Sequence, residues 1–116
     1  MRKDDLTRMR HMLDAARDAI VFSRNKNRQT LTNDRMLVLS LVKSIEIIGE
    51  AASKVSIESR NQFPEIPWTV IVAMRNRLIH AYYDVDLDRV WDTITDDLPP
   101  LILSLENITK KEDPSV

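Results

Sequence analysis

A dense cluster of reactive side chains lies within residues 75–82, which read Arg-Asn-Arg-Leu-Ile-His-Ala-Tyr. The cluster combines guanidinium, amide, imidazole and phenol groups, and His80 is one of only two histidines in the chain. A guanidinium can hold a phosphate through two parallel hydrogen bonds, and an imidazole can accept or donate a proton near neutral pH. These residue types therefore favour chemistry on a phosphate group.

The cluster is expected at the C-terminal end of a helix over residues 67–82. Pro67 suits the first turn of that helix, where its missing N–H costs nothing. Arg and His side chains near the last carbonyls of a helix are favourable in any protein, so each cation taken singly also fits a simple capped helix end. Asn76 and the two tyrosines add nothing to such a cap, and the set as a whole therefore favours a functional site.

The helical spacing groups these side chains on one side, provided that the helix continues through Tyr83. At about 100° per residue, Arg75 and Tyr82 share one line along the helix surface. Asp84 comes four residues after His80, so we expect its carboxylate to accept a hydrogen bond from the imidazole. The line next to that of the arginine holds Asn76, His80 and Tyr83.

The rest of the chain predicts an all-α fold in one domain. The length of 116 residues fits a single domain, and one Gly with 5% aromatic residues leaves little material for hairpins and sheets. Apolar residues recur at helical spacing, with Arg and Asp on the other face of the first helix. We expect an antiparallel four- to five-helix bundle that forms a homodimer. The expected helices cover residues 4–24, 33–55 and 67–82 and begin again near 86, in a domain of residues 1–109 with a disordered tail at 110–116.

Three local features accompany these helices. Asn33 or Thr32 is expected to cap the helix over 33–55, whose apolar face is broad enough to touch two layers or a second subunit. Residues 56–65 predict a short helical turn followed by a loop. Pro99-Pro100 are expected to end or kink the last helix.

Charge is unevenly distributed along the chain. Residues 2–28 hold eight Arg or Lys against four Asp, and residues 84–97 hold six Asp against one Arg, although the net charge is only −1. This polarity would steer an anionic ligand to one end or pair subunits head to tail. The alternative is that both segments are simply solvated helix faces.

Composition and spacing argue against several other classes of protein. The chain has no cysteine, which excludes disulfides and thiolate metal sites, and its two histidines are too far apart for a His-x3-His pair. His11 with Asp14 is more typical of a surface pair than of a metal site. No segment has the length of a membrane span, and the start of the helix at residue 67 has no side chains suited to reading DNA bases. We expect a cytoplasmic protein without metal, membrane or DNA.

The reactive cluster resembles the signature of the HEPN superfamily, in the form Arg75-x4-His80-x-Tyr82 with Asn76 directly after the arginine. The chain is most similar to the HepT-like toxins of prokaryotic toxin–antitoxin pairs. The resemblance covers nearly the whole chain, since it also includes Gly49-Glu50, Ile66-Pro67-Trp68 and Val85-Asp86.

The resemblance implies a metal-independent RNA endonuclease that acts as a homodimer and needs no cofactor, with two motifs facing each other across the interface. It assigns Arg75 and His80 as the catalytic pair and Asn76 as an assisting polar group. It also implies a type VII-like toxin–antitoxin system, in which a nucleotidyltransferase antitoxin silences the nuclease by transferring AMP to Tyr82. The spacing of the motif prefers Tyr82 to its neighbour Tyr83 as the acceptor.

The chemistry of the residues agrees with a dimeric site. RNA cleavage without a metal uses the 2′-OH as the nucleophile, so one group must take its proton and another must protonate the leaving 5′-oxygen. One imidazole can hardly do both, whereas a two-fold interface supplies two copies of His80. Arg75 would stabilise the charge of the transition state, and Asp84 is expected to assist by orienting the imidazole.

The main alternative is a non-catalytic HEPN domain that serves as the partner or nucleotide-binding subunit of a nucleotidyltransferase. The charge polarity and the broad apolar face over residues 33–55 would suit that role as well. The intact pair of Arg75 and His80 favours the nuclease, because a pure adaptor needs neither.

Overall fold

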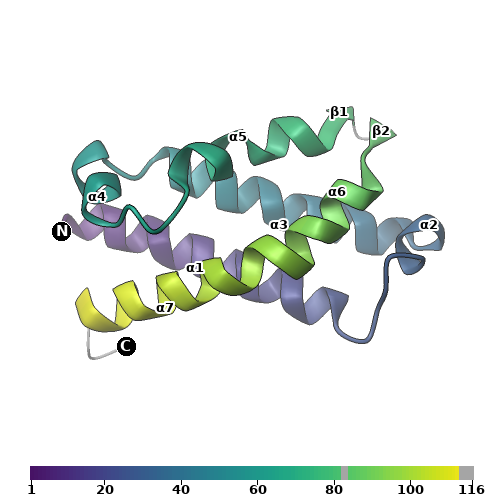
Figure 1. The fold of residues 1–116 in the computed structure, drawn as a ribbon, viewed down its shortest axis with the longest axis horizontal. Coiled ribbons are helices and arrows are strands. Elements are labelled where there is room, and N and C mark those ends of the chain that lie inside the picture. Colours follow the sequence, from purple (N-terminus) through teal and green to yellow (C-terminus); the bar gives the residue numbers. More distant parts are fainter. Residues whose placement is uncertain (82–83, 113–116) are drawn as a thin grey trace.

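The computed structural model describes residues 1–81 and 84–112, and it describes the side chains of these residues outside the range 75–81. Four long helical segments lie side by side and alternate in direction, while the short elements cluster at the two ends (Figure 1). The elements are α1 Lys3–Ser23, α2 Thr30–Asn33, α3 Arg35–Ser53, α4 Ile57–Gln62, α5 Trp68–Leu78, β1 Ile79–Ala81, β2 Asp84–Val85, α6 Leu87–Asp92, the π-helical turn η1 Thr93–Asp97 and α7 Leu98–Glu112.

The architecture confirms the predicted all-α antiparallel bundle. Helix α1 packs against both α3 and α7, and α5 packs against the other side of α3. The broad apolar face of α3 therefore covers two neighbours within one chain, as the width of that face predicted. Within residues 1–81 and 84–112, no helix combines the length and apolar content that crossing a membrane requires.

Helix α3 begins later than the sequence suggested. Its N-cap is Asp34, whose carboxylate accepts a hydrogen bond from the backbone N–H of Leu37 at 3.0 Å, so the predicted caps Asn33 and Thr32 are wrong. Both of those residues instead belong to the short helix α2, which the sequence did not reveal. A four-residue helix has too few positions to show an apolar period, which explains why it was missed.

The helix that carries the reactive cluster is shorter than expected. Helix α5 ends at Leu78, and Ile79–Ala81 form a strand that pairs antiparallel with Asp84–Val85. The prediction of one continuous helix over residues 67–82 is therefore wrong. Ile79 and Val85 are β-branched and suit a strand, and Val85 and Leu87 pack against the bundle core. This contact with the core explains why the chain turns back after α5 instead of extending the helix.

The helix does not end at Pro99-Pro100, because the chain passes from α6 through the π-helical turn η1 into α7 without leaving helical geometry. The two prolines lie in the first turn of α7, where a missing N–H is tolerated. The N–H of Leu98 bonds to the carbonyl of Thr93, five residues earlier, which gives the widened turn before the prolines. Helix α7 continues to Glu112, so residues 110–112 of the expected tail are helical, and residues 113–116 lie outside the described residues.

Candidate active site

A bulged hairpin lies at the end of the bundle where α5 stops, close to α2 (Figure 1). In its register, Ile79 faces Val85 and Ala81 faces Asp84. From one pair to the other, β1 moves by two residues and β2 by only one. His80, which lies between the two paired residues of β1, is therefore the extra residue of a β-bulge. Bulges bend a strand and redirect a side chain, and they are enriched beside active sites. The local backbone therefore sets His80 apart from its neighbours.

The structure divides the predicted catalytic residues between two elements. Arg75 and Asn76 lie in the last turn of α5, whereas His80 lies on β1. These side chains were expected to align on one helix surface, but Ile79–Ala81 form a strand, so the helix surface of α5 ends at Leu78. Tyr82 and Tyr83, the two candidates for modification, lie outside the described residues.

Asp84 lies near His80 because of strand pairing and not, as expected, because of helical spacing. It is the first residue of β2, is exposed, and lies opposite Ala81, the residue that follows His80. Paired residues of an antiparallel ladder have Cα atoms about 5 Å apart. The strand pairing therefore places the Asp84 backbone beside that of His80, although the two residues do not share a helix face.

Some charges of the basic segment 2–28 and of the acidic segment 84–97 form ion pairs with each other. The guanidinium of Arg28, in the connection after α1, bonds to the carboxylate of Asp88 at 2.7 Å and also to that of Asp92. The hydrogen bond to Asp88, followed by that to Asp92, raises the pKa of Arg28 above its usual value. These ion pairs bring the basic and acidic segments together and tie α6 to the polypeptide just before α2.

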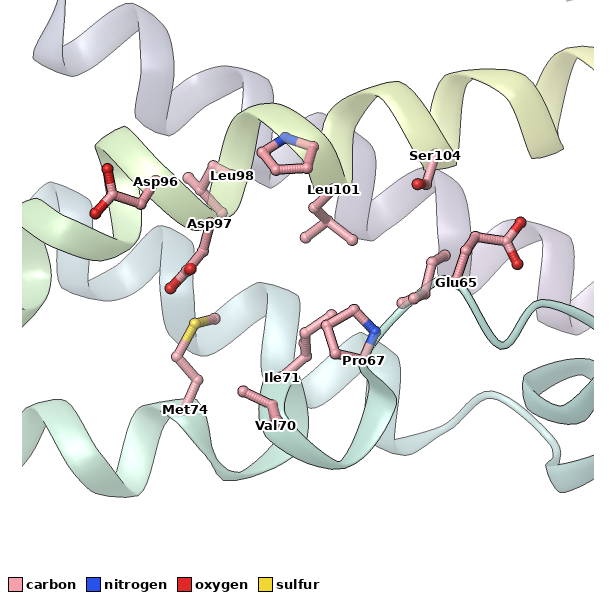
Figure 2. A pocket seen from close by; sticks show the side chains of 12 residues that line it. Glu65, Pro67, Val70, Ile71, Met74, Asp96, Asp97, Leu98, Leu101 and Ser104 are labelled. Carbon is pink, nitrogen blue, oxygen red and sulfur yellow. The ribbon is translucent and has the colours of Figure 1, made fainter.

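An apolar groove lies between α5 and α7, and its last α5 residue, Met74, directly precedes Arg75. In Figure 2, Val70 and Met74 of α5 face Leu101 of α7 across the groove. Its volume is about 280 Å³. Burial, with the nearby Asp96 and Asp92 carboxylates, raises the pKa of Asp97 at one end of the groove. Apolar walls and carboxylates make this groove unsuited to a polyanion such as RNA.

A second, more polar pocket lies beside the hairpin, and the sequence had not pointed to it. It has a volume of about 300 Å³ and brings Arg35 and the residues of α2 next to β2. A cation at the start of a helix is too common to attract attention in a sequence. The described residues that line this α2–β2 pocket are Leu31, Thr32, Asn33, Arg35, Val38, Val85 and Leu87.

Comparison with known proteins places this chain in a family. The family model described as "Ribonuclease HepT-like" matches residues 12–108. A Methanocaldococcus jannaschii protein named "Putative RNase MJ1380" is 32% identical over 95 residues, which cover 82% of this chain and 87% of that protein. A Caldanaerobacter subterraneus protein named "Putative RNase TTE0752" is 36% identical over 84 residues, or 72% of this chain and 75% of that protein.

A third relative carries the family name itself. The Thermococcus cleftensis protein named "Probable ribonuclease HepT" is 36% identical over 77 residues, which cover 66% of this chain and 70% of that protein. No solved structure matches the chain with significance. The family match over residues 12–108 includes the last turn of α5, the bulged hairpin and nearly all of the bundle. The chain belongs to the HepT-like ribonuclease family of the HEPN superfamily.

Proposed function

We propose that this protein is a metal-independent endoribonuclease and the toxin of a type VII-like toxin–antitoxin pair. The observation that carries the proposal is the complete motif Arg75-x4-His80-x-Tyr82, whose histidine occupies a β-bulge directly after α5. The match to the ribonuclease family supports the general activity. The arrangement of the motif supports the finer assignment of roles.

The proposed reaction is an internal transesterification of RNA. One His80 takes the proton of a ribose 2′-OH, and the 2′-oxygen attacks the adjacent phosphorus. The bond from phosphorus to the 5′-oxygen then breaks, while the second His80 of a homodimer protonates that oxygen. The products are a 2′,3′-cyclic phosphate and a free 5′-OH, so no water or metal-bound hydroxide enters this step.

The other motif residues have supporting roles in this proposal. Arg75 pairs with the phosphate oxygens, whose negative charge increases in the transition state. Asn76 assists by hydrogen bonding to the substrate. Asp84 stands beside the bulge through the ladder, and we assign it the positioning of the imidazole and the stabilisation of its protonated form.

A metal-independent reaction predicts that RNA cleavage continues in EDTA. We expect the rate of cleavage of a fluorescent RNA to change less than about twofold in 5 mM EDTA, because proton transfer by histidine needs no Lewis acid. Mass spectrometry of the products should find the 2′,3′-cyclic phosphate. A rate that collapses in EDTA and returns with a divalent ion would contradict the mechanism.

Modification by AMP is the proposed switch. The phenolic oxygen of Tyr82 would attack the α-phosphate of ATP in the antitoxin, with pyrophosphate as the leaving group. The added adenylate is bulky and anionic, so it would obstruct the cleft and repel the RNA backbone. Incubation with ATP and a HepT-associated nucleotidyltransferase is expected to add one AMP mass to a peptide that contains Tyr82 and to stop cleavage.

Two variants separate the neighbouring tyrosines. Tyr82→Phe is expected to resist both the added mass and the loss of cleavage, while Tyr83→Phe should be modified and silenced like the natural chain. Modification of Tyr82→Phe would transfer the acceptor role to Tyr83. Silencing of both variants without added mass would mean that the antitoxin acts by binding alone.

A further inference from the structure

The α2–β2 pocket is the polar cavity that lies nearest to the bulged hairpin in the described part of the chain. One wall consists of α2 and the start of α3, and the other consists of Val85 of β2 and Leu87, the first residue of α6. Val85 is the ladder partner of Ile79, the residue before His80. Ladder and backbone spacings therefore place the pocket wall within about 10 Å of the His80 backbone.

The pocket contains an available cation. Arg35 is exposed, and it makes no ion pair with the described part of the chain. Arg28 stands only seven residues earlier, but its guanidinium is occupied by Asp88 and Asp92. A guanidinium without a carboxylate partner is suited to bind a phosphate through two parallel hydrogen bonds. The guanidinium of Arg35 can therefore bind an anionic ligand, whereas that of Arg28 is already paired with two carboxylates.

The remaining lining has two further kinds of surface. Leu31, Val38, Val85 and Leu87 supply apolar carbon. The exposed Asn33 amide can both donate and accept hydrogen bonds, and the Thr32 hydroxyl, which donates to the carbonyl of Gln29 at 2.8 Å, can still accept. A volume of about 300 Å³ suits one small ligand. These groups match the parts of a nucleotide: the apolar surface suits the base, the amide and hydroxyl suit the edge of the base, and the cation suits the phosphate.

The wall of the pocket is also fixed in position. The two ion pairs of Arg28 connect α6, which supplies Leu87, to the segment that leads into α2. The side chain of Asn27 accepts hydrogen bonds from the backbone and the hydroxyl of Thr30 at the start of α2. Both sides of the cavity are thus held by contacts that exist without a ligand, which lowers the cost of binding.

We propose that the α2–β2 pocket binds a nucleotide of the RNA strand that flanks the cleaved phosphate. Arg35 binds its phosphate, the apolar residues contact its base, and Asn33 and Thr32 contact the base edge. This inference rests on the proposed ribonuclease function and adds to it a second contact region outside the catalytic motif. The apolar groove along α5 cannot serve this purpose because Asp96 and Asp97 would repel the backbone.

The test compares Arg35→Gln with Lys54→Gln, which removes a positive charge at the opposite end of α3, about 28 Å away. Binding of a short 2′-O-methyl RNA, which cannot be cleaved by its own 2′-OH, is measured by fluorescence anisotropy over a range of salt concentrations. Arg35→Gln is expected to weaken binding about tenfold and to reduce the salt slope by about one. Lys54→Gln should leave both values within about twofold of the natural chain.

Cleavage kinetics provide the second readout. Arg35→Gln should raise KM about tenfold and change kcat less than about threefold, because Arg35 lies outside the reacting groups. Asn33→Ala should alter the preferred base next to the cut while the protein remains folded, since Asn33 is exposed. Arg35→Lys should recover part of the affinity, as a point charge replaces a two-pronged donor.

The outcomes distinguish the pocket from the proposed function. Equal oligonucleotide binding by Arg35→Gln and Lys54→Gln overturns the pocket assignment, even if the protein cleaves RNA. Failure of the natural chain to cleave RNA overturns the ribonuclease proposal, while the binding comparison still decides on the pocket. Free AMP and ATP are measured in parallel, and an Arg35-dependent affinity for these nucleotides without an effect on the oligonucleotide overturns the RNA assignment.

Discussion

Replacement of His80 by alanine is expected to reduce RNA cleavage by about 10³- to 10⁴-fold. The imidazole is proposed to move a proton at the 2′-oxygen and, from the second subunit, at the 5′-oxygen, and each such transfer contributes about 10²- to 10⁴-fold. Arg75→Ala should cause a loss of similar size, because the negative transition state would lose its guanidinium. Both losses should appear in kcat, measured with a fluorescent RNA at saturating concentration.

The second histidine provides a matched control. His11 is exposed on α1, so His11→Ala should retain cleavage within about twofold. Far-ultraviolet circular dichroism and size-exclusion chromatography should show that the His80 variant keeps the fold and the oligomeric state of the natural chain. Cleavage that survives both His80→Ala and Arg75→Ala would remove the assignment of the active site.

Mixing experiments extend this prediction to the dimer. If each site needs His80 from both subunits, an equal mixture of natural and His80→Ala chains, refolded together, retains about a quarter of the cleavage rate per total protein. Independent sites in each subunit would retain about half. The measured dependence of rate on the fraction of natural chain therefore tests whether the motif forms half of a shared site.

Replacement of Asp5 by alanine is expected to lower the free energy of unfolding by about 3 kcal/mol, the largest stability effect outside the apolar core. Asp5 is only 3% exposed. Its carboxylate accepts hydrogen bonds from the backbone N–H of Ser56 at 2.9 Å and from the hydroxyls of Ser56 and Ser59. Loss of a charged acceptor leaves the buried Ser59 donor and the half-buried Ser56 donors without this partner, which costs about 1–3 kcal/mol for a fully buried group.

The expected change in melting temperature is about 10 °C, which differential scanning calorimetry can measure. Asp4→Ala is the matched control, since Asp4 is the exposed neighbour in the same helical turn. That control should shift the melting temperature by less than about 3 °C. Equal shifts for the two variants would mean that the contact between α1 and α4 contributes nothing specific.

The same carboxylate gives a pH dependence with a defined sign. Burial alone would raise the pKa of Asp5, but the hydrogen bonds from Ser56 and Ser59 outweigh burial and hold the pKa below its usual value. A lowered pKa means that the folded protein binds the proton less tightly than the unfolded chain does. The contribution to stability is therefore complete above about pH 4 and is lost as the pH falls through the folded pKa.

Asp5→Asn tests this pH dependence because it preserves the shape of the side chain. The difference in unfolding free energy between the natural chain and Asp5→Asn, measured by urea denaturation, should be constant between pH 5 and 8 and should shrink below about pH 4. A difference that grows in acid would show that the carboxylate is not stabilised by its hydrogen bonds.

The sequence alone was sufficient for the class of fold and for the family. Apolar residues at three- and four-residue steps bury Met9, Leu13 and Ala16 on α1, because the helix period is a local property that the order of residues states directly. The motif residues are equally local, since their types and spacing are read without any coordinates. The family match over residues 12–108 agrees with the ribonuclease family that the motif resembles.

Features that depend on contacts between segments distant in sequence could not be predicted from the sequence. Asp5 was expected on the solvated face of its helix, and it is buried because Ser56 and Ser59, more than 50 positions later, satisfy its carboxylate. A polar residue is stable in the interior only if its partners are present, and a sequence does not reveal which segments will meet. The same limitation applied to the α2–β2 pocket, whose two walls are about 50 residues apart.

The end of α5 shows most directly which features follow from the sequence and which depend on the tertiary structure. The sequence by itself determined that Arg75, Asn76, His80 and Tyr82 lie within eight consecutive positions, but it equally allowed one continuous helix through all of them. Only the tertiary structure decided that the helix stops at Leu78 and that His80 becomes the extra residue of a bulge. The physical reason is that a short strand gains its hydrogen bonds from a partner strand and its burial from the core, and neither is encoded in the local period.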